Sequence, residues 1–231
     1  MREALIQAQS LSRIYRHGET EVVALASANF VLDRRDRIAL VGRSGCGKTT
    51  LLHLMAALDT PTGGVIDWPA LGSPDTLLPA KISLVFQTPS LLDPLTVSEN
   101  VALPLLMADA AESGDCAGNI ERAVAAALAT FGLEALAQKL PEELSGGQMQ
   151  RVAMARATVG RPLVILADEP TGQLDQATGQ ALLDALIAHL ADTPTALVIA
   201  THDPSVSERM NTIWRMERGV LTEAEPTGRR T

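Results

Sequence analysis

The run from Gly42 to Thr49, GRSGCGKT, constrains the fold of this chain more than any other feature. It fits the pattern G-x-x-x-x-G-K-[ST], and it lies between the apolar run Ile38–Val41 and the helical pattern Lys48–Leu58. Glycine lets backbone N–H groups point inward at phosphate oxygens, and the helix N-terminus adds partial positive charge. The sequence therefore predicts a phosphate-binding loop within an open α/β sheet.

We expect the loop to bind the phosphates of ATP, with Lys48 on the outer phosphates and the Thr49 hydroxyl on Mg²⁺. The expected contact set is Gly42, Arg43, Ser44, Gly45, Cys46, Gly47, Lys48, Thr49 and Thr50. A glycine-rich turn without a ligand is the simplest alternative. A dinucleotide site is disfavoured because the glycines run G-x-x-G-x-G. Cys46 is interpreted as a small loop residue rather than a catalytic thiol.

Other apolar runs predict the rest of the sheet. Ile82–Phe86, Leu163–Ala167 and Ala196–Ala200 have the length of buried strands, and Val22–Leu32 alternates weakly, as antiparallel strands do. The region between them is helical, most clearly at Ile120–Phe131 and Met149–Val159. The predicted fold class is α/β: a P-loop core with a mostly parallel sheet, an antiparallel β subdomain and an inserted helical subdomain.

The chain is expected to form a single domain. Its core and β subdomain are predicted at about 1–87 and 161–222, and the helical subdomain at about 88–160. We expect a connection at Ala111–Gly118 inside the helical region, and a polar, frayed tail over 223–231.

Composition excludes several functional classes. A net charge of −8 and a pI near 5.0 argue against a nucleic-acid partner, which would need a basic face. The sequence contains neither an apolar run long enough to span a membrane nor an apolar segment typical of a signal peptide. Two cysteines, Cys46 and Cys116, do not form a disulfide framework, so a reducing cytoplasm is expected. A role at the membrane would require a partner.

Two carboxylates follow the predicted strand at Leu163–Ala167. Asp168 and Glu169 would lie at the C-terminal edge of a parallel sheet, where ligands bind. Asp168 is suited to hold Mg²⁺, directly or through water, and Glu169 could polarise the attacking water as a general base. The alternative is a polar strand end that simply leads into a loop.

A second helix start with anion-binding character follows Leu144. Ser145, Gly146, Gly147 and Gln148 place a capping serine and two glycines before the helical run Met149–Val159. A nucleotide kinase with a single site has no need for this element. On its own, the segment Leu144–Gln148 would be interpreted as the start of an ordinary serine-capped helix.

The order of these motifs resembles the nucleotide-binding subunits of ABC transporters across almost the whole chain. In that family Gly42–Thr49 corresponds to the Walker A loop, Leu144–Gln148 to the signature and Leu163–Glu169 to the Walker B strand. Four shorter matches complete the order: Gln87 of the Q-loop, the D-loop Gly172–Asp175, the switch His202, and Tyr15, which the family uses to stack on adenine. Taken singly, Gln87 could be an exposed strand end, His202 a structural histidine and Tyr15 a packing residue.

The resemblance implies catalytic roles for Glu169, His202, Lys48 and Gln87, and a Mg²⁺ site at Thr49, Gln87 and Asp168. It also implies a head-to-tail dimer in which Ser145, Gly146, Gly147 and Gln148 contact the ATP held by the other subunit. A separate membrane permease would dock around Thr88–Leu106, where Leu91, Leu92 and Leu95 are expected to be exposed. The chain would then lie at the cytoplasmic face of the membrane, paired with itself or with a similar ATPase.

Within the family, Asp168–Asp175 is similar to the branch of lipoprotein-release, macrolide-efflux and cell-division ATPases, although Gln173 replaces the usual Asn. Arg34–Arg37 and Gly63–Leu78 depart from the family pattern. An exporter or a lipoprotein-extruding system is therefore expected. The alternatives are an ATPase that signals through a membrane partner to cell-wall or division machinery, and a DNA-maintenance ATPase head. The latter would carry a long coiled-coil insertion or a DNA-binding domain.

Overall fold

The computed structural model describes residues 4–18, 20–109 and 117–226. The strands are β1 (Ala4–His17), β2 (Thr20–Asp33), β3 (Arg37–Val41), β4 (Gly63–Asp67), β5 (Ile82–Val85), β6 (Val164–Asp168), β7 (Ala196–Thr201), β8 (Thr212–Glu217) and β9 (Val220–Pro226). The helices are α1 (Lys48–Met55), α2 (Val97–Asp109), α3 (Ala117–Thr130), α4 (Gly146–Val159), α5 (Gln176–Leu190) and α6 (Pro204–Ser207). Short 3-10 turns lie at Pro74–Thr76, Glu134–Leu136 and Pro141–Glu143.

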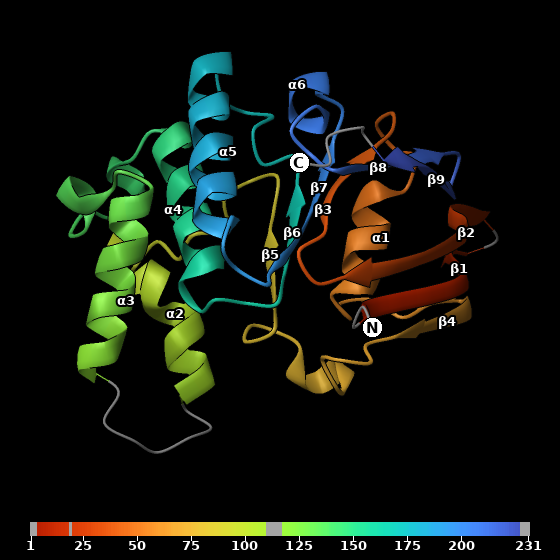
Figure 1. Ribbon diagram of the computed structural model, residues 1–231, viewed down its shortest axis with the longest axis horizontal. Coiled ribbons are helices and arrows are strands. Elements are labelled where there is room, and N and C mark those ends of the chain that lie inside the picture. The colour runs from red at the N-terminus through yellow and green to blue at the C-terminus, as the bar shows by residue number, and fades with distance from the viewer. Residues whose placement is uncertain (1–3, 19, 110–116, 227–231) are drawn as a thin grey trace.

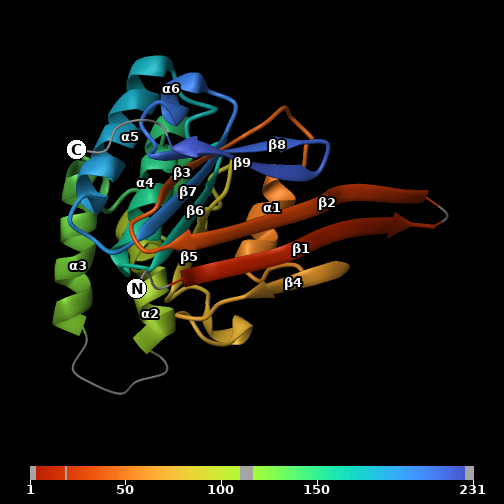
Figure 2. The ribbon, with the colours of Figure 1, turned by 45° about the vertical axis from the view of Figure 1, so that its right-hand side comes forward.

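The nine strands form one sheet in the order β4-β1-β2-β9-β8-β3-β7-β6-β5 (Figure 1). From β8 to β5 neighbouring strands are parallel, whereas β4, β1 and β2 pair antiparallel and form the long ribbon that projects to the right in Figure 2. Helices α2, α3, α4 and α5 lie together on one side of the parallel strands, and α1 lies on the other (Figure 1). This arrangement is the predicted fold class.

The central strands separate two hydrophobic cores because alternate side chains point to opposite faces. In β6, Val164 and Leu166 pack with α1 and the antiparallel ribbon, whereas Ile165 and Ala167 pack with α2, α4 and α5. β3 and β7 alternate in the same way. Both faces are covered, which explains why these strands read as continuous apolar runs in the sequence.

Helix α1 ends earlier than predicted, at Met55 rather than Leu58. Ala57 has a left-handed φ of 55°, the N–H of Leu58 bonds to the carbonyl of His53 at 2.9 Å, and that of Ala57 bonds to Leu54 at 3.1 Å. These two bonds form a Schellman end, which is more often built on glycine. The chain therefore turns away before Leu58 and Asp59.

The frayed tail predicted over 223–231 is wrong for its first part. Arg218 and Gly219 adopt left-handed φ values of 48° and 76°, which form a tight hairpin turn after β8. The chain then continues as β9, with Trp214 opposite Glu223 and Thr212 opposite Pro226. Residues 227–231 lie outside the described residues. So does most of the expected connection at 111–118, although α3 already begins at Ala117.

Candidate active site

The loop from Gly42 to Gly47 joins β3 to α1 and packs tightly against two other strands. A Cβ on Gly42 would collide with the carbonyl oxygen of Met216 in β8, and one on Gly47 with that of Ala24 in β2. Gly47 also has a left-handed φ of 107° at the N-cap of α1. Glycine is therefore required by the chain itself at Gly42 because of the space, and at Gly47 because of both the space and the backbone conformation.

The side chains that follow the loop reach the predicted acid pair. Lys48, only 7% exposed, donates from Nζ to the carbonyl of Gly42 at 2.8 Å and lies 3.7 Å from Oε1 of Glu169. The Thr49 hydroxyl donates to Oδ2 of Asp168 at 2.5 Å. Two motifs more than a hundred residues apart thus meet at the C-terminal edge of the parallel strands, where ligands of open α/β sheets bind.

Glu169 is held in an unusual conformation between two partners. Its φ of 45° is left-handed, which is rare for a residue other than glycine, and its N–H is bonded to the carbonyl of Ala200 at 2.9 Å. Both carboxylate oxygens lie 3.0 Å from Nδ1 of His202, the first residue after β7. The Glu169 side chain is 11% exposed and that of His202 is 71% exposed. Backbone strain of this kind is typical of functional sites.

A cavity of about 560 Å³ collects most of the predicted residues and is large enough for a nucleotide. Its lining comprises Arg43, Ser44, Gly45, Gly47, Lys48, Thr49, Thr50, Gln87, Asp168, Glu169 and His202, together with Val22, Val23 and Ala24 of β2. Gly42 and Cys46 of the expected contact set are not among these residues. Cys46 is buried in the core beside α1.

The three residues from β2 were missed by the sequence reasoning. Val22 is 52% exposed and Val23 is 55% exposed, so two large apolar side chains face solvent beside the phosphate loop. The weak alternation of Val22–Leu32 was the available signal, but it does not show which face of the ribbon meets the loop. Tyr15 does not line the cavity. It lies directly opposite Val22, a lining residue, in the β1–β2 pair.

The second predicted helix start lies apart from this cavity. Ser145 is the N-cap of α4: its hydroxyl accepts from the N–H of Gln148 at 3.3 Å, and the Gln148 side chain accepts from the N–H of Ser145 at 2.8 Å. Ser145 and Gly146 are exposed. A Cβ on Gly146 would meet no atom of the described chain within 4 Å. One chain therefore does not bring Ser145–Gln148 to its own phosphate loop.

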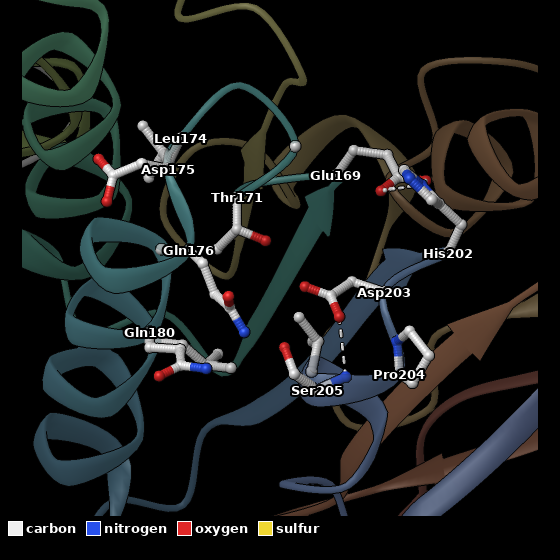
Figure 3. A pocket seen from close by; sticks show the side chains of 14 residues that line it. Glu169, Thr171, Leu174, Asp175, Gln176, Gln180, His202, Asp203, Pro204 and Ser205 are labelled. Atoms are coloured by element: carbon white, nitrogen blue, oxygen red, sulfur yellow. Dashed lines mark hydrogen bonds and ion pairs between the residues drawn. The ribbon is translucent and has the colours of Figure 1, made fainter.

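A second cavity of about 410 Å³ shares Glu169 and His202 with the first (Figure 3). The loop that follows β6 and the start of α5 form one wall, and the segment from Asp203 to Val206 forms the other (Figure 3). Asp175 caps α5 by accepting from the N–H of Thr178 at 3.0 Å, and hydrogen bonds from the Thr178 side chain and backbone hold the pKa of Asp175 below its usual range. The predicted D-loop thus lies next to the candidate catalytic pair.

An apolar groove of about 270 Å³ lies between α2, α4, β5 and the segment after α1. Leu58, Leu78, Pro79, Ile82, Ser83, Leu84, Phe86, Leu103, Pro104, Met107, Arg156 and Ala157 line it. Leu58, Phe86 and Met107 are 52%, 40% and 63% exposed. Arg156 of α4 donates to the carbonyl and hydroxyl oxygens of Ser90 at 2.8 and 3.0 Å, which fastens α4 to the segment after Gln87.

The groove coincides only partly with the surface predicted at Thr88–Leu106. Of the three leucines expected to be exposed there, only Leu92 is, at 49%. Leu91 packs against the core beneath the helices, and Leu95 is half-buried. The expectation failed because a loop leucine can turn inward when a helix layer lies below it, and its sequence context does not reveal this.

Known proteins resemble this chain both in sequence and in structure. The family profile described as "ABC transporter" matches residues 25–172. The lipoprotein-releasing system ATP-binding protein LolD of Legionella pneumophila (strain Paris) is 38% identical, over 97% of this chain and 100% of that protein. LolD of Bordetella pertussis is 37% identical over 94% of each chain. The dimeric post-hydrolysis structure of the ATP-binding cassette MJ0796 with ADP and Pi superimposes with a TM-score of 0.86 at 32% identity, over 97% of this chain and 100% of that chain.

Proposed function

This chain belongs to the ABC transporter family as an ATP-binding cassette with ATPase activity, and we propose that two copies close around two ATP molecules to drive a separate membrane permease. One observation carries the proposal. A single cavity gathers the phosphate loop, Gln87, both acids and His202, whereas the glycine-rich start of α4 lies exposed elsewhere on the same chain.

Three side chains of the cavity have distinct roles in the proposed hydrolysis. Lys48, now bonded to the Gly42 carbonyl, is within reach of phosphate oxygens that enter the loop. Water attacks the γ-phosphorus and breaks its bond to the bridging oxygen of ADP, and the water proton passes to the Glu169 carboxylate. His202 holds both oxygens of that carboxylate in place. A positioned carboxylate base typically contributes about 10²–10⁴-fold in rate.

The residues at the sheet edge fit a magnesium ion. The Thr49 hydroxyl lies 2.5 Å from Oδ2 of Asp168, and Gln87 lines the same cavity, so three side chains with the oxygen ligands that Mg²⁺ prefers are available there. Mg²⁺ commonly uses few protein ligands and completes its shell with phosphate and water oxygens. When bound, the ion would neutralise charge that develops on the phosphates during transfer.

The start of α4 supports a dimer in which each ATP contacts both copies. Ser145 and Gly146 are exposed, a Cβ on Gly146 would meet no described atom within 4 Å, and the Ser145 hydroxyl accepts a 3.3 Å bond from its own helix. Backbone N–H groups at such a helix start bind anions. We propose that Ser145 and the glycines meet the γ-phosphate of the ATP held by the second copy. The solved dimers of MJ0796 are consistent with such pairing.

The apolar groove is our proposed docking site for a cytoplasmic helix of the permease. Leu58, Phe86 and Met107 offer the exposed apolar surface, and Arg156 in the lining joins α4 to Ser90 in the segment after Gln87. A helix seated there would contact Phe86, the neighbour of Gln87, together with α2 and the signature helix α4. No helix of the described chain could itself span a bilayer. The similarity to LolD favours lipoprotein release at the cytoplasmic face of the membrane as the process driven.

Replacing Glu169 with glutamine tests the proposed function. Glu169→Gln keeps the shape of the side chain but cannot accept the water proton, so we expect ATP to bind normally while turnover falls about 10²-fold or more, roughly 3 kcal/mol of barrier. The unhydrolysed ATP should hold the dimer together, which size-exclusion chromatography with ATP and Mg²⁺ would detect. Turnover near the wild-type rate would contradict the assignment.

A further inference from the structure

We propose that Asp59, in the loop after α1, is a positioning residue that sets the orientation of the Tyr15 ring relative to the phosphate loop and thereby the affinity for the base of ATP. The inference rests on the proposed function, because it takes ATP as the ligand of the 560 Å³ cavity. It concerns a contact between residues 44 positions apart.

Asp59 is the centre of a closed cluster. Its Oδ2 accepts from the Tyr15 hydroxyl at 2.7 Å and from Nε of Arg13 at 2.9 Å, and its Oδ1 lies 2.7 Å from Nη2 of Arg13. The Arg13 guanidinium also lies over the Tyr15 ring, 4.6 Å from the ring centre. The side chains of Arg13 and Asp59 are only 22% and 17% exposed. A bidentate arginine and a charged acceptor fix the ring more firmly than the backbone alone.

The charge on Asp59 is maintained by these partners. Partial burial by itself would raise the pKa of Asp59, but the hydrogen bonds from Tyr15 and from the N–H of Thr60, together with Arg13, hold that pKa below its usual range. The carboxylate is therefore ionised at neutral pH. An ionised acceptor makes stronger hydrogen bonds than a neutral one.

The cluster joins the β1–β2 ribbon to the segment that follows α1. Tyr15 lies directly opposite Val22, and directly opposed side chains of an antiparallel pair share a face. Val22 lines the cavity, so Tyr15 stands beside it with one ring face covered by Arg13. Asp59 follows helix α1, whose N-terminus carries Lys48. One carboxylate thus joins Tyr15, which is paired with Val22 of the cavity lining, to the segment that follows the phosphate-binding helix.

Titration calorimetry with ATP and with inorganic tripolyphosphate tests the proposal. In Asp59→Ala and in Tyr15→Phe we expect ATP to bind about fivefold more weakly, the size expected for one orienting hydrogen bond, with tripolyphosphate affinity unchanged. The double variant should bind ATP no more weakly than either single variant. Glu21→Gln is the matched control, because it breaks the exposed Arg16–Glu21 ion pair of the same ribbon without touching Tyr15.

A spectroscopic signal distinguishes a change in the orientation of the Tyr15 ring from a general loss of structure in the variant. The sequence has one tyrosine, so 3-fluorotyrosine labelling gives a single ¹⁹F resonance from Tyr15. We expect ATP to shift it and tripolyphosphate to leave it in place. In Asp59→Ala without nucleotide, the resonance should already move toward that of free fluorotyrosine.

Several results would overturn the proposal. Wild-type ATP affinity in Asp59→Ala, or equal losses for ATP and tripolyphosphate, would show that Asp59 does not act on the base. Should Asp59→Ala fail to fold, Tyr15→Phe removes only one oxygen and the same comparison applies. Unchanged ATP affinity in Tyr15→Ala would show that the base does not bind at Tyr15, whereas loss of ATP and tripolyphosphate binding in Lys48→Ala would still support the proposed function.

Discussion

The two glycine-rich helix starts of this chain look alike in sequence but differ in what surrounds them. At α1, a Cβ on Gly47 would collide with the Ala24 carbonyl, and the loop is packed between β2 and β8. At α4, a Cβ on Gly146 would meet no atom of the described chain within 4 Å. The first glycine is required by the chain's own fold, whereas the second has no such internal reason.

This difference indicates where the anion that binds at the start of α4 must come from. A helix N-terminus attracts anions wherever it is, but only the one at α1 lies in a cavity with Lys48 and the two acids. Any requirement for glycine at position 146 must therefore come from a molecule outside this chain. The proposed dimer provides such a molecule, because the ATP held by the second copy would fill the space beside Gly146. The following predictions test the contrast, beginning with the largest effect.

Mixing two inactive variants tests the contrast most strongly. We expect Lys48→Ala and Ser145→Arg each to lower ATP hydrolysis about 10²-fold or more, roughly 3 kcal/mol of barrier, since one loses the phosphate cation and the other fills the α4 start. Mixed dimers contain one site with neither change, so hydrolysis should reappear on mixing, measured as phosphate release.

The control for mixing is Lys48→Ala combined with a chain that carries both changes. Every site in such a mixture keeps at least one damaged element, so activity should stay at background. Recovery there, or full activity of Ser145→Arg alone, would mean that the α4 start does not serve the second copy's nucleotide.

Alanine at the two glycines should separate stability from activity. Gly47→Ala forces a side chain into a left-handed backbone and into the Ala24 carbonyl, so we expect a loss of about 2 kcal/mol or more in unfolding free energy. Gly146→Ala lies in the first turn of α4, where alanine should leave stability equal or raise it by up to about 1 kcal/mol. Urea unfolding measures both. ATP hydrolysis should nevertheless fall in Gly146→Ala, and a fully active variant would contradict the comparison.

The smallest effect concerns a third helix start, that of α5, which is capped by a carboxylate instead of a hydroxyl. The folded-state pKa of Asp175 lies below its usual value of 3.8. Its stabilising effect is therefore present above that value and is lost as the pH falls through the folded-state pKa. We expect Asp175→Ala to melt at a lower temperature than the wild type at pH 7, with the gap closing in strong acid. Asp175→Asn keeps a cap without charge and should show little of this pH dependence. A gap that persists in strong acid would exclude the ionised cap as its cause.

Local features of the fold were accessible from the sequence, whereas contacts across the chain were not. β6 and β7 were predicted to within one residue, because strands buried on both faces are continuous apolar runs. The phosphate loop was evident from its glycines and flanks. The position of Tyr15 depends on Asp59, 44 residues away, and the lining by Val22–Ala24 depends on which face of the ribbon meets α1. Neither is encoded in a local pattern. The strand β9 was missed because three of its last five residues, Thr222, Glu223 and Glu225, are polar, although the turn at Arg218 and Gly219 marked its start.

The alternation of side chains along β6 has an evolutionary consequence. Neighbouring residues such as Ile165 and Leu166 belong to different cores, one shared with the helices and the other with α1. A substitution at Ile165 therefore has to be accommodated by side chains of the helical layer, and one at Leu166 by those around α1. The sheet thereby divides the interior into two packing units that can accumulate substitutions separately.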